Sequence, residues 1–161
     1  MQEMLAGVHG DWVAGIGPLT ADEAATTLIM ARVDANGHGI AAQIGDGLAL
    51  IREGGRFRRL TPARVGFGNM TDALTALHRP EQWGWTGFSL AEPGDGIALM
   101  TDGVADDLDP DGLPAFMEAL GGDVRRRRRR RGRRWLQAEL TDWATPMHSD
   151  DKSLVAIFRD G

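Results

Sequence analysis

The strongest constraint on the fold of this chain is a short turn between two apolar segments. Residues 26–33 read TTLIMARV, an apolar and partly β-branched run typical of a buried strand. Asp34-Ala35 and Asn36-Gly37 follow, and Asn-Gly is typical of tight turns between antiparallel strands. Ile40 to Ile44 then predicts a second strand, so the sequence predicts a β-hairpin near its N-terminal end.

Further short strands, with helices late in the chain, predict an α+β fold. Helices are expected at Leu113 to Leu120, ending at Gly121-Gly122, and around the apolar positions Trp135 to Trp143. Residues 1–18 show no clear period and predict an irregular or weak opening element, and Thr20 to Glu23 has the spacing of a capping box before a short helix. The other expected strands are Leu48 to Arg52, Arg56 to Leu60, Gly84 to Leu90, Ile97 to Met100 and Ser153 to Phe158.

Length and composition favour one folded domain over residues 1–161. The chain is 42% hydrophobic, which is typical of a globular protein, and it contains no cysteine. Disulfides and cysteine-based zinc sites are therefore excluded, and a cytoplasmic setting fits. We expect no membrane association, because no apolar run approaches the ~18 residues of a membrane span, and residues 1–10 lack the regions of a signal peptide.

The charge is unevenly distributed along the chain. Residues 125–134 read RRRRRRRGRR and hold nine of the 18 basic residues, whereas the remainder has nine basic and 23 acidic residues. We interpret this run as an arginine-rich insertion between two helices, solvated or disordered. The alternative is a surface for phosphate-rich partners such as nucleic acid, which we weigh as the less favoured interpretation.

Several carboxylates occur where an expected strand begins or ends. Asp46 is the middle residue of a Gly-Asp-Gly turn that follows one strand. Asp102 follows IALM in Thr-Asp-Gly, and Asp150 and Asp151 directly precede SLVAIF. If these strand ends meet, the like charges favour a cation between them, and oxygen ligands suit Mg²⁺ or Mn²⁺. The alternative is that each Asp only forms a turn with the local backbone. The three acids after Asp102 are interpreted as solvent-facing turn residues: Asp106, Asp107 and Asp109.

Four blocks in order resemble the metal-dependent protein phosphatases of the PP2C family, and a bacterial branch of that family in particular. The blocks are TTLIMARV, AAQIGDG, GDGIALMTDG and SDDKSLVAIF, and FGNMTDALT resembles a further segment of the bacterial branch. The resemblance implies an αββα sandwich of two antiparallel sheets flanked by helices. It also implies two or more Mn²⁺ or Mg²⁺ ions and a metal-activated water that hydrolyses phosphoserine or phosphothreonine in a phosphoprotein substrate.

The same resemblance assigns roles to individual residues. Asp102 and Asp150 match metal ligands of the family, and Asp46 matches a residue that helps to hold a further, weaker metal. Gly103 lets the chain turn away from the site, and Asp151 would orient the last loop together with Ser153. Two neighbours of the site come from the flap-like segment, Asn69 and Asp72.

The chain departs from the family pattern before residue 26. The early acidic block and the Asp-Gly block of the family are not visible there, so the chain resembles the C-terminal two-thirds of the domain. Either a separate chain supplies the N-terminal half, or this is a degenerate member. We therefore keep three hypotheses: a phosphatase, a catalytically inactive phosphatase-like binding or regulatory module, and nucleic-acid binding through the arginine run.

Overall fold

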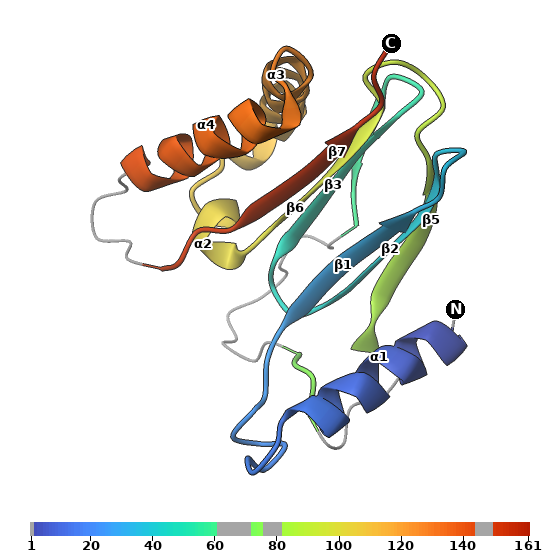
Figure 1. The fold of residues 1–161 in the computed structure, drawn as a ribbon, viewed down its shortest axis with the longest axis vertical. Helices are drawn as coiled ribbons and strands as arrows, with labels where there is room; N and C mark the ends of the chain where they lie inside the picture. The colour runs from blue at the N-terminus through green and yellow to red at the C-terminus, as the bar shows by residue number, and fades with distance from the viewer. Residues whose placement is uncertain (1, 61–71, 76–81, 144–149) are drawn as a thin grey trace.

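The protein is a sandwich of two antiparallel sheets with helices on both outer faces. A computed structural model describes residues 2–60, 72–75, 82–143 and 150–161. One sheet has the strand order β1-β2-β5 and the other β4-β3-β6-β7 (Figure 1). The strands are β1 (Leu28–Val33), β2 (His38–Ile44), β3 (Leu48–Glu53), β4 (Arg56–Arg59), β5 (Gly84–Ser89), β6 (Gly96–Met100) and β7 (Leu154–Phe158). The helices are α1 (Gln2–Gly15), α2 (Asp102–Ala105), α3 (Leu113–Arg125) and α4 (Arg129–Asp142), with a 3₁₀ turn at Pro110–Gly112.

The predicted hairpin is confirmed. Strands β1 and β2 pair antiparallel, with Leu28 opposite Ile44 and Val33 opposite Gly39. The carboxylate of Asp34 accepts hydrogen bonds from the backbone amides of Asn36 and His38. Gly37 has a φ of +92°, a conformation that favours glycine. The Asp-Ala-Asn-Gly sequence therefore forms the turn by the mechanism its residues predict.

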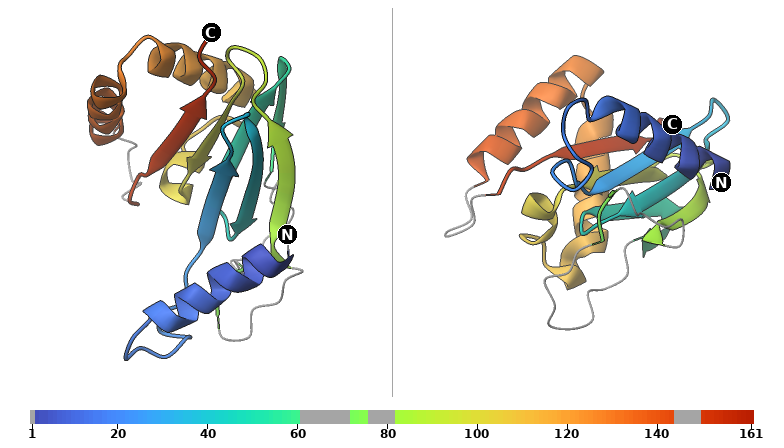
Figure 2. Two further views of the ribbon diagram at one scale, coloured as in Figure 1. Left: turned by 45° about the vertical axis from the view of Figure 1, so that its right-hand side comes forward. Right: turned by 90° about the horizontal axis from the view of Figure 1, so that it is seen from below.

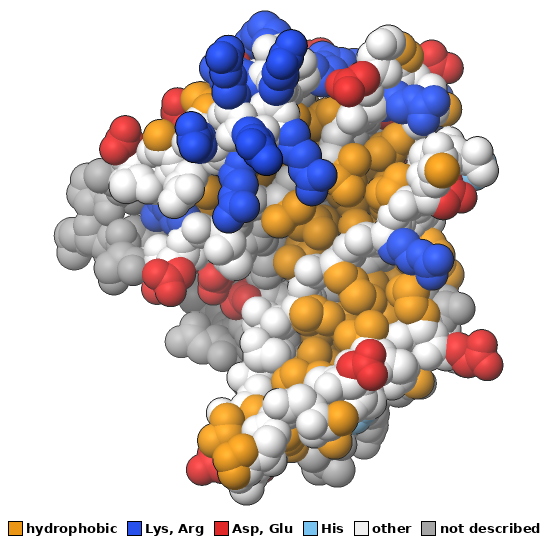
Figure 3. Space-filling model, in the orientation of Figure 1, with side chains coloured by type: hydrophobic (Ala, Val, Ile, Leu, Met, Phe, Trp, Pro, Cys, Tyr) orange, Lys and Arg blue, Asp and Glu red, His pale blue; other side chains and the backbone are white. Residues whose placement is uncertain are grey.

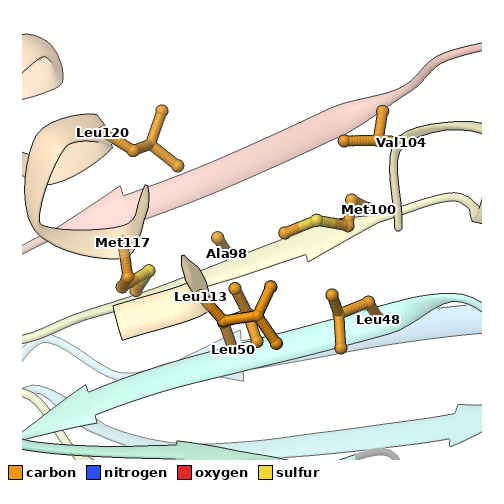
Figure 4. Close-up of a cluster of buried hydrophobic side chains, with 8 residues drawn as sticks. All are labelled: Leu48, Leu50, Ala98, Met100, Val104, Leu113, Met117 and Leu120. Atoms are coloured by element: carbon orange, nitrogen blue, oxygen red, sulfur yellow. The ribbon is translucent and has the colours of Figure 1, made fainter. Parts of the chain in front are cut away.

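The buried apolar side chains form three clusters, one between the two sheets and one on the outer face of each sheet. Between the two sheets, Ala41 of β2 and Phe88 of β5 pack with Ile51 of β3 and Ile97 of β6. The opposite face of sheet β4-β3-β6-β7 packs against α3 through a second cluster, shown in Figure 4, and the partly buried side chains of α4 pack against this cluster. The third cluster joins α1 to the outer face of sheet β1-β2-β5. This order of layers is the predicted αββα sandwich, which is confirmed (Figure 2).

The N-terminal segment is a helix, so the prediction of an irregular opening element is wrong. Helix α1 spans Gln2–Gly15. Its apolar side chains Leu5, Val8 and Trp12 recur at helical spacing and pack against the β1-β2 hairpin. Two internal glycines, Gly7 and Gly10, weaken the local helical signal, and packing onto the sheet compensates for them. The capping box at Thr20 and Glu23 forms both of its hydrogen bonds, but it closes a turn and not a helix.

Helix α3 does not end at Gly121-Gly122, as predicted, but continues to Arg125. A Cβ at position 121 would lie 2.7 Å from the ring of Phe158 on β7, so this glycine allows the close approach of helix and strand. The arginine run is helical for most of its length, because Arg125 ends α3 and Arg129 begins α4. The alternative of a disordered insertion is therefore wrong.

Among the described residues, none of the helices combines the length and the apolar character that crossing a bilayer requires.

Candidate functional site

The end of β6 and the start of β7 are tied together by hydrogen bonds around Thr101. The backbone amide of Thr101 donates to the carbonyl of Ser153 at 3.1 Å. The amide of Ser153 donates to Oγ1 of Thr101 at 3.0 Å, and that hydroxyl donates to the carbonyl of Asp151 at 3.1 Å. These bonds hold the segment that carries Asp102 beside the segment that carries Asp150 and Asp151. Sequence reasoning did not select Thr101, although its place between the strand and Asp102 was a usable signal.

Gly103 allows the two segments to come into direct contact. A Cβ at this position would lie 2.6 Å from the carbonyl oxygen of Asp151 and 3.1 Å from Cβ of Asp150. The glycine is therefore required by the approach of the last loop. Asp102 is the first residue of α2, and its carboxylate accepts a hydrogen bond from the amide of Gly103 at 2.8 Å.

A buried ion pair forms a second connection between the same segments. Nζ of Lys152 lies 3.0 Å from Oδ2 of Asp107, and their side chains are only 9% and 4% exposed. The interpretation of Asp107 as a solvent-facing turn residue is therefore wrong, whereas Asp106 and Asp109 are exposed as expected. The burial of Asp107 depends on a tertiary contact, because Lys152 lies 45 positions further along the chain.

Asp46 lies at the same end of the sandwich. The register of β3 and β6 places Leu48 opposite Met100, and a Cβ at Gly47 would lie 2.8 Å from the carbonyl oxygen of Met100. The turn that carries Asp46 therefore adjoins the strand end that leads into Asp102. The side-chain amide of buried Gln43 donates to the carbonyls of Gly45 and Gly47 and holds this turn in place. Gln43 was also missed, although a glutamine within the apolar strand AAQI was a signal.

The two flap residues are placed less closely. Asp72 accepts a hydrogen bond from the side chain of Gln82 at 3.0 Å, near the bridge between Thr26 and Leu74. Asn69 lies outside the described residues.

An open groove runs from the last loop along β7 and α4. The loop side contributes Asp150 to Ser153, and β7 contributes Leu154 and Val155. The helix side is mixed in character, with Arg133 and Gln137 among apolar side chains such as Leu136 and Trp143. Of the candidate carboxylates, Asp150 and Asp151 line this groove, together with the cation of Arg133.

The donor chemistry suits a hard divalent cation, but the number of donors is small. Carboxylate oxygens are the ligands that Mg²⁺ and Mn²⁺ prefer. Asp102 and Asp150 belong to adjoining segments, yet among the described residues no three His, Asp or Glu side chains lie close enough to share one ion. The described residues therefore form at most part of a metal site.

Comparisons with known proteins agree with this architecture. The family model for protein phosphatase 2C matches residues 2–143. No match is found among curated protein sequences. One solved structure of the phosphatase domain of the cell fate determinant SpoIIE from Bacillus subtilis is 13% identical, with a TM-score of 0.51, and covers 84% of this chain and 59% of its own. A manganese-presoaked structure of the same domain is 14% identical, with a TM-score of 0.53, and covers 92% of this chain and 63% of its own.

At these identities the likeness to the solved structures concerns the fold. The chain spans about three fifths of the length of those phosphatase domains.

Proposed function

Because the chain belongs to the protein phosphatase 2C family, we propose that it takes part in the hydrolysis of phosphoserine and phosphothreonine in proteins. One observation supports the proposal most strongly. The Thr101 hydrogen bonds and the close approach at Gly103 hold two acidic segments together at the ends of adjacent strands. An ordinary turn-forming Asp needs no such fastening to a segment 50 residues away.

The proposed cofactor is Mn²⁺ or Mg²⁺, two or more ions in the complete site. Asp102 and Asp150 would supply carboxylate oxygens, and Asp46 would hold a further ion from the neighbouring turn. A bound divalent ion lowers the pKa of a coordinated water and neutralises negative charge on a phosphoryl group. The residues of this chain hold the strand ends in register, orient the last loop through Asp151, and leave a groove beside it for the substrate polypeptide.

The small number of donors implies that a further polypeptide segment completes the site. Carboxylates beyond Asp102, Asp150 and Asp46 are needed for a multi-ion centre. The related phosphatase domains contain additional polypeptide, because this chain covers only 59% and 63% of their lengths. We propose that this segment, on the same or on a separate chain, brings the missing acidic groups to the ends of β6 and β7.

The limited donor set also favours a second candidate function. A phosphatase-like module without a complete metal site would capture a phosphoprotein or a partner subunit without turnover. We propose the cytoplasm as the compartment in both cases, because a chain without cysteine needs no oxidising environment.

Phosphate release and metal binding together separate the two functions. We expect the purified chain to bind Mn²⁺ by calorimetry, and Asp102→Asn and Asp150→Asn each to weaken this binding at least about tenfold. Asp111→Asn is the matched control, because Asp111 is an exposed carboxylate on the 3₁₀ turn outside the site. We then measure hydrolysis of an aryl phosphate or a phosphopeptide. Hydrolysis that requires Mn²⁺ and is lost in Asp102→Asn supports the phosphatase function.

No hydrolysis in saturating Mn²⁺ shows that this chain alone does not catalyse the reaction. Mn²⁺ binding that Asp102→Asn leaves unchanged contradicts the assignment of the metal ligands.

A further inference from the structure

Two arginines from different elements meet over the turn that leads into β6. Arg52 of β3 lies two positions after Leu50, so it shares the face of the sheet that packs against α3. Arg125 is the last residue of α3. A Cβ at Gly94 would lie within 2.6 Å of Nη1 of both arginines, so the two guanidinium groups rest against the same buried glycine.

Regular secondary structure directs both side chains to this place. Arg52 is paired within the sheet, with Gly96 of β6 opposite it. Nε of Arg125 donates a hydrogen bond to the carbonyl of Gly121 at 3.2 Å, and the end of a helix also attracts cations to its unpaired carbonyls. The two cations are therefore held close together by the fold, and not by a contact between mobile side chains.

The carboxylates nearest to the pair in sequence are bound to other groups. These are Glu53 with Arg58, Asp95 with the backbone amides of Gly54 and Glu92, and Asp123 with Arg126 and Arg127. Over the parts of the chain that the structure describes, no ion pair joins Arg52 or Arg125 to a carboxylate. The positive charge of the pair is thus not balanced by the protein itself.

The remaining arginines of the run are arranged differently. Figure 3 shows basic side chains gathered over α4. From Arg128 to Arg134 they are exposed on the surface of one helix, where water and salt screen their charges. At Arg52 and Arg125, two cations from separate elements converge on one point. Like charges at short range disfavour each other, so this geometry suits an anion bound between the two groups.

From this convergence we infer that Arg52 and Arg125 form a binding site for a phosphate group. Guanidinium groups present pairs of N–H donors that match the oxygens of a phosphate, and two of them balance the charge of a phosphate dianion. A carboxylate has only two oxygens and one charge, so it matches the pair less well. Two sources share the phosphate chemistry: a phosphorylated side chain of a protein, and the free phosphate ion.

This site is separate from the candidate metal site and goes beyond the proposed function. Strand β6 begins two residues after Gly94 and ends two residues before Asp102. Its five residues span about 16 Å, so the two sites lie at opposite ends of the strand. A phosphate group at the arginine pair is therefore bound without being hydrolysed.

Titration followed by nuclear magnetic resonance tests the site directly. Isotope-labelled protein is titrated with inorganic phosphate in metal-free buffer at constant ionic strength, and then with a phosphoserine peptide and its unphosphorylated form. We expect phosphate to shift the Nε–H signals of Arg52 and Arg125 and the amide signal of Gly94. Acetate should bind at least about tenfold more weakly. Asp102→Asn should leave phosphate binding unchanged, so a failure of the proposed catalysis does not affect this outcome.

Substitutions of equal charge locate the binding. We expect Arg52→Gln and Arg125→Gln each to weaken phosphate binding about tenfold or more, because each removes charge-assisted hydrogen bonds. Arg125→Lys keeps the charge but loses the planar fork, so it should recover only part of the affinity. The controls are Arg56→Gln on β4 and Arg130→Gln on α4, which alter exposed arginines away from the pair and should bind phosphate like the unaltered protein.

Thermal unfolding provides a second measurement and shows whether each variant is folded. At matched ionic strength, phosphate should raise the melting temperature of the unaltered protein and of Arg130→Gln, because a ligand that binds only the folded state stabilises it. The increase should be absent in Arg52→Gln and Arg125→Gln.

Several results would overturn the inference. They are no shift of either arginine signal, a loss of affinity in Arg130→Gln equal to that in Arg125→Gln, and acetate binding as tight as phosphate binding. Loss of binding in Asp102→Asn would place the phosphate at the candidate metal site instead. Binding that is tighter for the phosphopeptide than for inorganic phosphate, and absent for the unphosphorylated peptide, supports the site and identifies a phosphoprotein as the source. Equal binding of peptide and inorganic phosphate supports the site and identifies the free ion.

Discussion

Removing one partner of the buried Lys152–Asp107 pair should destabilise the protein far more than removing both. In Lys152→Met, the long apolar chain is retained and only the charge is lost, so the carboxylate of Asp107 remains where it is 4% exposed. Burying an unpaired charge costs about 3–5 kcal/mol in comparable cases. In the double variant Lys152→Met/Asp107→Leu no charge is left in the interior.

The geometry sets the scale of the effect. At the observed 3.0 Å, two unit charges attract each other by about 5 kcal/mol at an effective dielectric constant of ~20. When both ions are present, this attraction offsets much of the cost of their desolvation. Removing one ion abolishes the attraction, whereas the desolvation cost of the remaining ion persists. We therefore expect Lys152→Met to lower the free energy of unfolding by about 3 kcal/mol, and the melting temperature by roughly 6–12 °C. The double variant should lie within about 1 kcal/mol of the unaltered protein.

Urea denaturation of the four proteins in the cycle gives the coupling energy directly. The control is Arg126→Met, which removes a pair with Asp123 whose arginine side chain is 71% exposed. We expect that change to cost less than about 1 kcal/mol. Equal midpoints for Lys152→Met and Arg126→Met would refute the reasoning, as would a double variant less stable than either single variant.

Three further predictions concern backbone approach, a buried acid and pH. Gly103→Ala forces a Cβ to 2.6 Å from a backbone oxygen of the last loop and should cost about 1–3 kcal/mol, whereas Gly7→Ala meets nothing within 4 Å inside α1 and should stabilise by about 1 kcal/mol, both measured by urea denaturation. Asp95→Ala should cost about 2–4 kcal/mol in the same assay, because the buried carboxylate accepts hydrogen bonds from two backbone amides that would lose their partners. A hydrogen bond from Arg127, and a second arginine beside it, hold the pKa of Asp123 below its ordinary value of 3.8. The folded state thus gains stability above that value and loses it as the pH falls through the lowered pKa, so melting temperatures of Asp123→Asn should fall less steeply below about pH 4.

The strands of this protein could be predicted because their signals are local. Alternation, β-branched residues and turn sequences such as Asp34-Ala35-Asn36-Gly37 depend on neighbours along the chain. The helices at the two ends were harder, because their limits depend on contacts with the sheets. Helix α1 is held by Leu5 and Trp12 against the sheet, despite two internal glycines. Gly121 continues a helix where glycine is typical of an end, because Phe158 needs the space.

The candidate site divides in the same way. Asp102 and Asp150 were recognisable as acids at strand ends, and the pairing of β6 with β7 brings their segments together. The groups that fasten these segments were not recognisable, since Thr101 and Lys152 act across some 50 positions of sequence. Asp107 was misjudged for this reason, because nothing near it in the sequence announces a buried cation.

The charge at the start of α4 has a consequence for how the protein responds to salt. The helix begins at Arg129 with no acidic residue in its first turn, so its positive end carries only cations. Arg130 and Arg134, four positions apart, add repulsion along one face. Added electrolyte screens such repulsion, whereas it weakens the ordinary attraction of surface ion pairs. The stability of this helix, and of the groove wall that it forms, should therefore increase with ionic strength. A surface held together by ion pairs usually shows the opposite dependence.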